Sequence, residues 1–111
     1  AFGHLSGKYL DGAQPEGARL TRFPAFGQRY TKANVAPAVA QYRDVARRFG
    51  VSLATLALAF VRQQWFTAST IIGATTLDQL RENLASASIT LDADCLAAID
   101  EVYWRYPNPA V

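Results

Sequence analysis

The stretch from Ser69 to Asn83 constrains the fold more than any other part of this chain. Ser69 to Ile72 is short, apolar and β-branched, which predicts a strand rather than a helix. Gly73 follows as a turn, and Thr76 with Gln79 has the spacing of a capping box that begins a helix. Free N–H groups and the helix dipole attract negative charge at such a helix start, so the pattern predicts an anion site.

The composition excludes several classes of protein. A net charge of +2 without a lysine/arginine run argues against a nucleic-acid partner. No apolar run reaches the roughly 18 residues of a membrane span, so we expect no membrane partner either. The single cysteine, Cys95, excludes an internal disulfide and favours a reducing compartment, so we expect a cytoplasmic protein. The chain lacks methionine and opens on Ala1-Phe2 in mid-pattern, which suggests a fragment.

Helical periodicity begins only after residue 33. Before it, a strand end near Phe2 is followed by a loop over Asp11 to Arg22 that is rich in glycine and charge. Apolar residues then recur at three- and four-residue steps in four segments. The predicted helices are Asn34 to Phe49 with Gly50 as its stop, Leu53 to Val61 with Ser52 as its cap, one starting at Thr76, and one capped by Asp92.

Several apolar side chains are predicted to be buried by helix packing. Leu77, Leu80 and Leu84 share one face of their helix, which we expect to dock on a core. The fourth helix directs Leu96, Ile99 and either Val102 or Tyr103 inward. The same expectation applies to the large aromatic residues Trp65, Phe66 and Trp104.

The order of these elements is incomplete for a free-standing domain. A lone four-residue strand needs neighbours to satisfy its backbone groups. The natural completion is a parallel α/β fold whose other strands lie outside these residues. In (β/α)₈ barrels the loops after strands 7 and 8 commonly form a phosphate site with a helix N-terminus. The loop after Leu5 and the turn at Gly73 would be those two loops.

Three motifs in this order resemble the C-terminal third of an aldo-keto reductase. They are Gly3 to Tyr9, Pro15 to Arg19, and Ile71 to Thr76 followed by Gln79, Glu82 and Asn83. The bacterial Tas-like group and the potassium-channel β-subunit branch are the nearest branches. The resemblance implies an α/β protein in which residues 1–111 form the C-terminal third of a (β/α)₈ TIM barrel. This part runs from the end of strand 7 to the C-terminal tail and is mostly helical, with one or two short strands.

The resemblance also implies an NADP(H) site. In the family, the loop after strand 7 folds over the pyrophosphate, and the segment after strand 8 holds the 2′-phosphate and the adenine. Gln79 stands where many relatives have an arginine that meets this phosphate, and the two branches named above share the glutamine. The matching positions are Leu5, Ser6, Gly7, Lys8 and Arg19 in the first loop, Gly73, Ala74 and Thr75 in the second turn, then Gln79, and finally Glu82 and Asn83 at the adenine amino group.

Catalytic residues are not expected in this chain, and neither is a metal. The family's aspartate, tyrosine, lysine and histidine tetrad belongs to the first half of the barrel. The intact protein is therefore expected to reduce aldehydes or ketones with NADP(H), whereas this chain alone is predicted to be inactive. The alternatives are a non-catalytic nicotinamide-nucleotide-binding regulatory subunit and an inactive fragment. The substrate and the oligomeric state are not assigned.

Each selected residue also has a purely structural interpretation. Gly73 fits a simple turn glycine, and Thr76 with Gln79 fits a capping box without a ligand. Lys8, Arg19 and Arg22 fit ordinary solvated charges. The lone His4 is interpreted as structural or solvent-facing, and Cys95 as inert packing.

Overall fold

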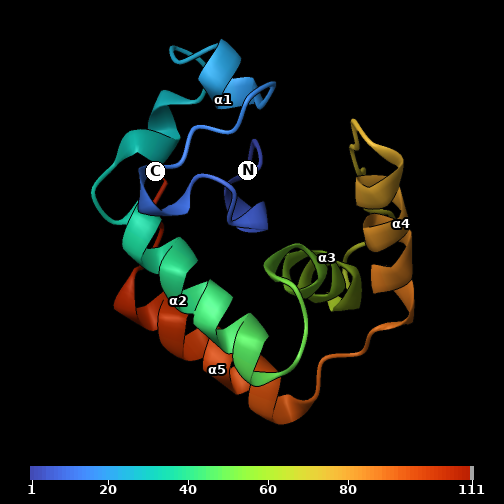
Figure 1. Cartoon of the computed structure of the whole chain (residues 1–111). Helices are drawn as coiled ribbons and strands as arrows, with labels where there is room; N and C mark the ends of the chain where they lie inside the picture. The colour runs from blue at the N-terminus through green and yellow to red at the C-terminus, as the bar shows by residue number, and fades with distance from the viewer. Residues whose placement is uncertain (111) are drawn as a thin grey trace.

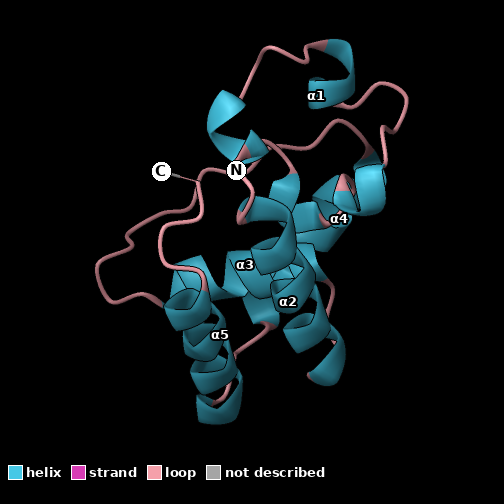
Figure 2. Ribbon diagram, turned by 90° about the vertical axis from the view of Figure 1, so that its left-hand side faces the viewer, coloured by secondary structure: helices cyan, strands magenta, loops and turns pink. Residues whose placement is uncertain are grey.

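The computed structural model describes residues 1–110, which form α-helices and 3₁₀ turns connected by loops (Figure 2). No β-strand occurs among these residues. No helix among them is long and apolar enough to cross a membrane. In chain order the elements are η1 (His4–Ser6), η2 (Leu10–Gly12), α1 (Arg19–Arg22), η3 (Gln28–Thr31), α2 (Val35–Arg48), α3 (Leu53–Gln63), α4 (Leu77–Ala85), η4 (Ser86–Ser88) and α5 (Ala93–Arg105).

Local sequence signals define the ends of the longer helices. Gly50 adopts φ +71°, and its N–H bonds to the Arg47 carbonyl while the Val51 N–H bonds to the Ala46 carbonyl. These two bonds form a Schellman motif, which ends α2. Ser52 caps α3 by accepting from the Thr55 N–H, and Asp92 caps α5 by accepting from the Cys95 N–H. These predicted boundaries are confirmed.

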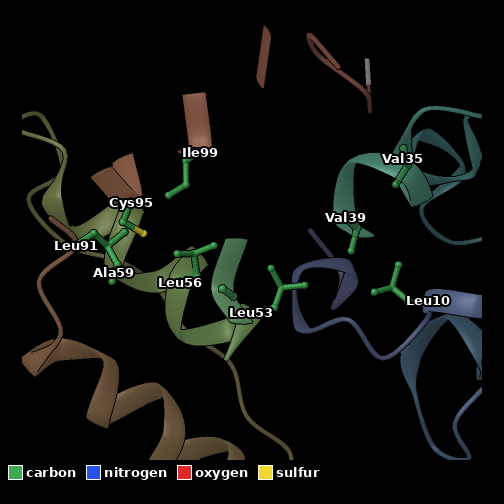
Figure 3. Close-up of a cluster of buried hydrophobic side chains, with 10 residues drawn as sticks. Leu10, Val35, Val39, Leu53, Leu56, Ala59, Leu91, Cys95 and Ile99 are labelled. Atoms are coloured by element: carbon green, nitrogen blue, oxygen red, sulfur yellow. The ribbon is translucent and has the colours of Figure 1, made fainter. Parts of the chain in front are cut away.

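The core lies where α2, α3 and α5 meet. α2 packs along α5, and α3 packs against α2 (Figure 1). At the far end of α3, the Gln63 amide donates to the Leu91 carbonyl and accepts from the Leu91 N–H, at 3.1 and 2.7 Å. The buried cluster draws side chains from all three helices and from the preceding loops (Figure 3): Leu10, Val35, Val39, Ala46, Leu53, Leu56, Ala59, Leu91, Cys95 and Ile99.

The predicted strand at Ser69 to Ile72 is not formed. These residues are irregular, and Ile71 is 98% exposed. The second expected strand end, near Phe2, is a turn with φ +48° at that residue. An extended segment becomes a strand only when a neighbour completes its hydrogen bonds, and residues 1–110 supply no such neighbour. The β-branched sequence of Ser69 to Ile72 is therefore not enough to form a strand without a neighbouring strand.

The prediction of a buried face on α4 is wrong for these residues. Leu77, Leu80 and Leu84 are 69%, 39% and 60% exposed. The main neighbours of α4 are α3 and the short η4 turn that follows it, and these leave the leucine face open. On α5, Val102 is buried and Tyr103 is exposed, which settles that alternative.

The large aromatic residues that were expected to be packed are also on the surface. Trp65, Phe66 and Trp104 are all exposed, and each makes an edge contact with a sequence neighbour. Together with the α4 leucines they are large apolar side chains left exposed in residues 1–110.

Two glycines provide a direct test of these local geometries. Replacement Gly50→Ala places a β-carbon on a left-handed residue, so we expect it to lower the free energy of unfolding by about 1–2 kcal/mol. Gly73 lies outside the left-handed region, and a β-carbon there would meet nothing within 4 Å. Gly73→Ala should therefore change stability by less than about 0.5 kcal/mol without ligand. Chemical denaturation measures both, and equal losses would contradict the assignment of Gly50 as the helix stop.

Candidate functional site

The start of α4 is organised by the side chains of Thr76 and Gln79. Thr76 Oγ1 accepts from the Gln79 N–H at 3.2 Å, as the capping box predicts. Gln79 Oε1 accepts from the Thr75 N–H at 2.9 Å and from the Thr75 hydroxyl at 3.1 Å. In a regular capping box it would accept from the N–H of the cap residue Thr76, so this contact is moved one residue toward the N-terminus. The Oε1 atom is thereby occupied. Gln79 is exposed, so its Nε2 group is open to solvent.

Asn83 closes the loop that precedes this helix. Its Nδ2 group donates to the Gly73 carbonyl at 3.1 Å, across ten positions of sequence. A carbonyl can only accept, so this bond fixes which side of the amide carries the nitrogen. The Asn83 Oδ1 atom is left as an acceptor on the opposite side. Asn83 is half-buried, whereas Gly73, Ala74 and Thr75 are exposed.

Glu82 places a carboxylate beside Asn83. Its Oε1 atom accepts from the Ser52 hydroxyl at 2.5 Å, so the start of α3 lies against α4. The sequence indicated Ser52 only as a helix cap. A contact between residues thirty positions apart gives no signal in local periodicity, so the sequence could not predict it.

The first predicted loop reaches the same region only in part. Leu5 and Ser6 line an open cleft of about 710 Å³ together with Asn83 from α4. Most of the remaining wall is apolar and comes from α3 and α5, with residues that include Leu53, Ala57, Phe60, Val61, Ile99 and Tyr103. The structure therefore brings one end of the predicted pyrophosphate loop to the predicted adenine end of the site.

The basic residues of the predicted site lie elsewhere. Lys8 and Gly7 line a second, more polar cleft of about 420 Å³ beside Arg43 and Arg47. Arg19 belongs to α1 and its guanidinium lies over the Phe2 ring, 5.6 Å from the ring centroid. Neither Lys8 nor Arg19 lines the cleft that contains Asn83. The two loops are thus adjacent in residues 1–110 without forming a single phosphate cradle.

His4 and Cys95 take the structural places that their sequence context predicts. The His4 ring stacks on Tyr30 with centroids 4.9 Å apart, and burial, assisted by the positive N-terminus, lowers the pKa of His4. Cys95 is 1% exposed, and burial, with a contribution from Asp92, raises the pKa of its thiol. A protonated, inaccessible thiol is a poor nucleophile at neutral pH, which agrees with a packing role for Cys95. No cluster of metal ligands occurs among the described residues.

The groups around α4 include both acceptors and donors of hydrogen bonds. The Glu82 carboxylate and Asn83 Oδ1 are acceptors at neighbouring positions of the sequence. Gln79 Nε2 offers a donor one helical turn away, at the positive end of the helix. A neutral amide can bond either a hydroxyl or a phosphate oxygen, so this set does not distinguish a ribose 2′-hydroxyl from a 2′-phosphate by charge.

Comparison with known proteins reveals extensive similarity. Residues 1–103 match the model of the aldo/keto reductase family. "Protein tas" of Escherichia coli strain K12 is 52% identical over 98% of this chain, which spans 31% of the length of that relative. "NADH-specific methylglyoxal reductase" of the same strain is 34% identical over 83% of this chain. The matched segment covers 28% of the length of that relative.

A third relative comes from the second expected branch. "Probable voltage-gated potassium channel subunit beta" of Arabidopsis thaliana is 33% identical over 80% of the chain, which covers 28% of that protein. These matches confirm the suspected family and both of its suspected branches. The chain belongs to the aldo/keto reductase family, whose fold is a (β/α)₈ barrel.

Proposed function

We propose that this chain is the C-terminal part of an aldo-keto reductase barrel and holds the phosphates and the adenine of a nicotinamide dinucleotide. The intact protein would use NADP(H) to reduce aldehydes or ketones. The family membership supports carbonyl reduction in general. The chain corresponds to under a third of the length of its tas relative, so the rest of the barrel would contribute the reacting groups.

The observation that carries this proposal is the fixed orientation of the Asn83 amide. Its bond to the Gly73 carbonyl ties the turn to the helix and leaves Oδ1 available to accept. A helix cap alone does not require this bond. A ligand amino group that donates two hydrogens would bond Asn83 Oδ1 and the carboxylate of the preceding residue, Glu82.

The residues of this chain would bind and orient rather than react. The nicotinamide, when bound, supplies the hydride. Gln79, Glu82 and Asn83 would hold the adenosine end, and the exposed Gly73 turn leaves room for a phosphate to approach the backbone. Leu5, Ser6, Gly7, Lys8 and Arg19 would close over the pyrophosphate once the remaining barrel fixes their loop. The proton donor for the carbonyl would come from outside these residues.

The choice between NADPH and NADH depends on which charges meet the 2′-phosphate. Lys8 and Arg19 are the cations that would offset the phosphate charge, and both stand apart from Asn83 here. Gln79 contributes hydrogen bonds without charge. One relative is named an NADH-specific reductase, so both cofactors occur as possibilities for this sequence type.

A regulatory subunit is the second candidate function. The relative named as a voltage-gated potassium channel subunit beta supports it. In that case the same residues would bind the dinucleotide as a ligand without turnover. The two functions are separated by mixing the intact protein with NADPH and a test aldehyde: oxidation at 340 nm supports the reductase, and binding without oxidation supports the regulatory subunit.

The first prediction for the site concerns cofactor choice. Gln79→Arg should strengthen NADPH binding relative to NADH by about tenfold, because a guanidinium can meet the 2′-phosphate bidentately. The ratio of the two dissociation constants in the intact protein is the measurement. Gln28→Arg adds the same charge on the exposed η3 turn and should leave the ratio unchanged. A ratio that stays constant in the Gln79 variant would show that this side chain does not face the 2′-position.

The second prediction separates binding from chemistry. Asn83→Ala removes both the adenine acceptor and the bond to Gly73, so the dissociation constant for NADPH should rise about tenfold. Turnover at saturating cofactor should change less than about twofold, because the adenine end is remote from the reacting carbon. Asn34→Ala is a matched control, since Asn34 is exposed and caps nothing with its side chain. Collapse of saturated turnover with normal affinity would refute the assigned role.

A further inference from the structure

Ser52 stands at a junction between two helices. Its Oγ atom accepts from the Thr55 N–H at 3.0 Å, which caps α3, and lies 2.5 Å from Glu82 Oε1 on α4. A carboxylate oxygen can only accept, so the serine hydroxyl donates its one hydrogen to Glu82. The Thr55 hydroxyl, 3.0 Å from Ser52 Oγ, is then the donor in its own contact with Ser52. One hydroxyl therefore serves both the end of α3 and the orientation of Glu82.

The surroundings favour this arrangement electrostatically. The Glu82 carboxylate lies at the N-terminus of α3, where the helix dipole is positive. No basic side chain forms an ion pair with Glu82 among residues 1–110. The Ser52 hydroxyl is therefore the side-chain contact that selects one rotamer of an otherwise exposed carboxylate.

We propose that Ser52 is a positioning residue for cofactor recognition, holding Glu82 so that its second oxygen meets the adenine amino group. This inference rests on the proposed function of Glu82. Ser52 does not touch the cofactor. The contact makes the affinity for adenine depend on the start of α3, whereas the proposed adenine-binding residues lie on α4.

The test compares two cofactors that differ only at the base. NADPH carries the adenine amino group, and its hypoxanthine analogue carries a carbonyl oxygen that a carboxylate repels. The ratio of their dissociation constants in the intact protein reports the contact with Glu82. It should be about tenfold in favour of NADPH in the parent protein. A change in overall stability weakens both cofactors and leaves the ratio unaltered.

Ser52→Asp is the main variant, because aspartate caps a helix as well as serine but has no hydrogen to donate and repels Glu82. Its ratio should fall to about twofold. Ser52→Gly tests the same loss without a new charge and with a small cost to the cap, and should give a similar fall. Ser52→Thr keeps both the cap and the hydroxyl, so its ratio should equal that of the parent protein. Asp92→Ser alters the cap of α5, away from α4, and should also leave the ratio at the parent value.

A Glu82→Ala background distinguishes the possible failures. There the ratio should already be low, and adding Ser52→Asp should change it no further. A low ratio in Glu82→Ala with a parental ratio in Ser52→Asp and Ser52→Gly would overturn the inference and leave the proposed role of Glu82 standing. A parental ratio in Glu82→Ala, or no binding of NADPH to the parent protein, would overturn both. A further fall on adding Ser52→Asp to Glu82→Ala would also overturn the inference.

Discussion

The packing of α3 determines how the η1 turn and α4 are placed. Its sequence is apolar on nearly all sides, and only part of that surface faces α2 and the buried cluster. The η1 turn contacts α3, and α4 contacts it as well. Since η1 carries Leu5 and Ser6 and α4 carries Asn83, α3 is the element that brings these three candidate residues to one cleft. Both the stability of the core and the geometry of the candidate site therefore depend on α3.

The same helix explains why much apolar surface remains uncovered. The wall of the larger cleft is mostly α3 and α5 side chains, and the α4 leucines face away from the buried cluster. In a (β/α)₈ barrel each helix covers strands on its inner side. Residues 1–110 contain helices without strands, so inner surfaces of this kind have nothing to cover. The exposed leucines and tryptophans are what such an arrangement produces.

The features that sequence predicted well are those fixed within a few residues. The Ser52 and Asp92 caps and the Gly50 stop depend on neighbours in the first or last turn of a helix, and all three are confirmed. The strand at Ser69 to Ile72 and the burial of the α4 leucines depend on partners from elsewhere, and both predictions were wrong for residues 1–110. The physical reason is the same in each case, because ladder hydrogen bonds and burial need a second surface.

For the candidate site too, the residues could be named from the sequence, whereas the contacts between distant residues could not. Its residues were named from motif order and resemblance, which required no knowledge of packing, and their roles remain predictions. The bond from Asn83 to Gly73 and the contact of Ser52 with Glu82 join residues ten and thirty positions apart, so neither was visible in periodicity. The separation of Arg19 from the cleft was likewise invisible, because it follows from the path of the loop between η2 and α1.

Hydrogen exchange in the intact protein tests most directly whether the turn and helix from Gly73 to Asn83 hold the adenosine end of the cofactor. Backbone amides in this segment should exchange more slowly when NADPH is added. Adenosine 2′,5′-bisphosphate, which carries the adenine and the 2′-phosphate without the nicotinamide, should slow the same amides, and reduced nicotinamide mononucleotide should not. Unchanged exchange in this segment under saturating NADPH, with protection appearing elsewhere in the protein, would contradict the assignment.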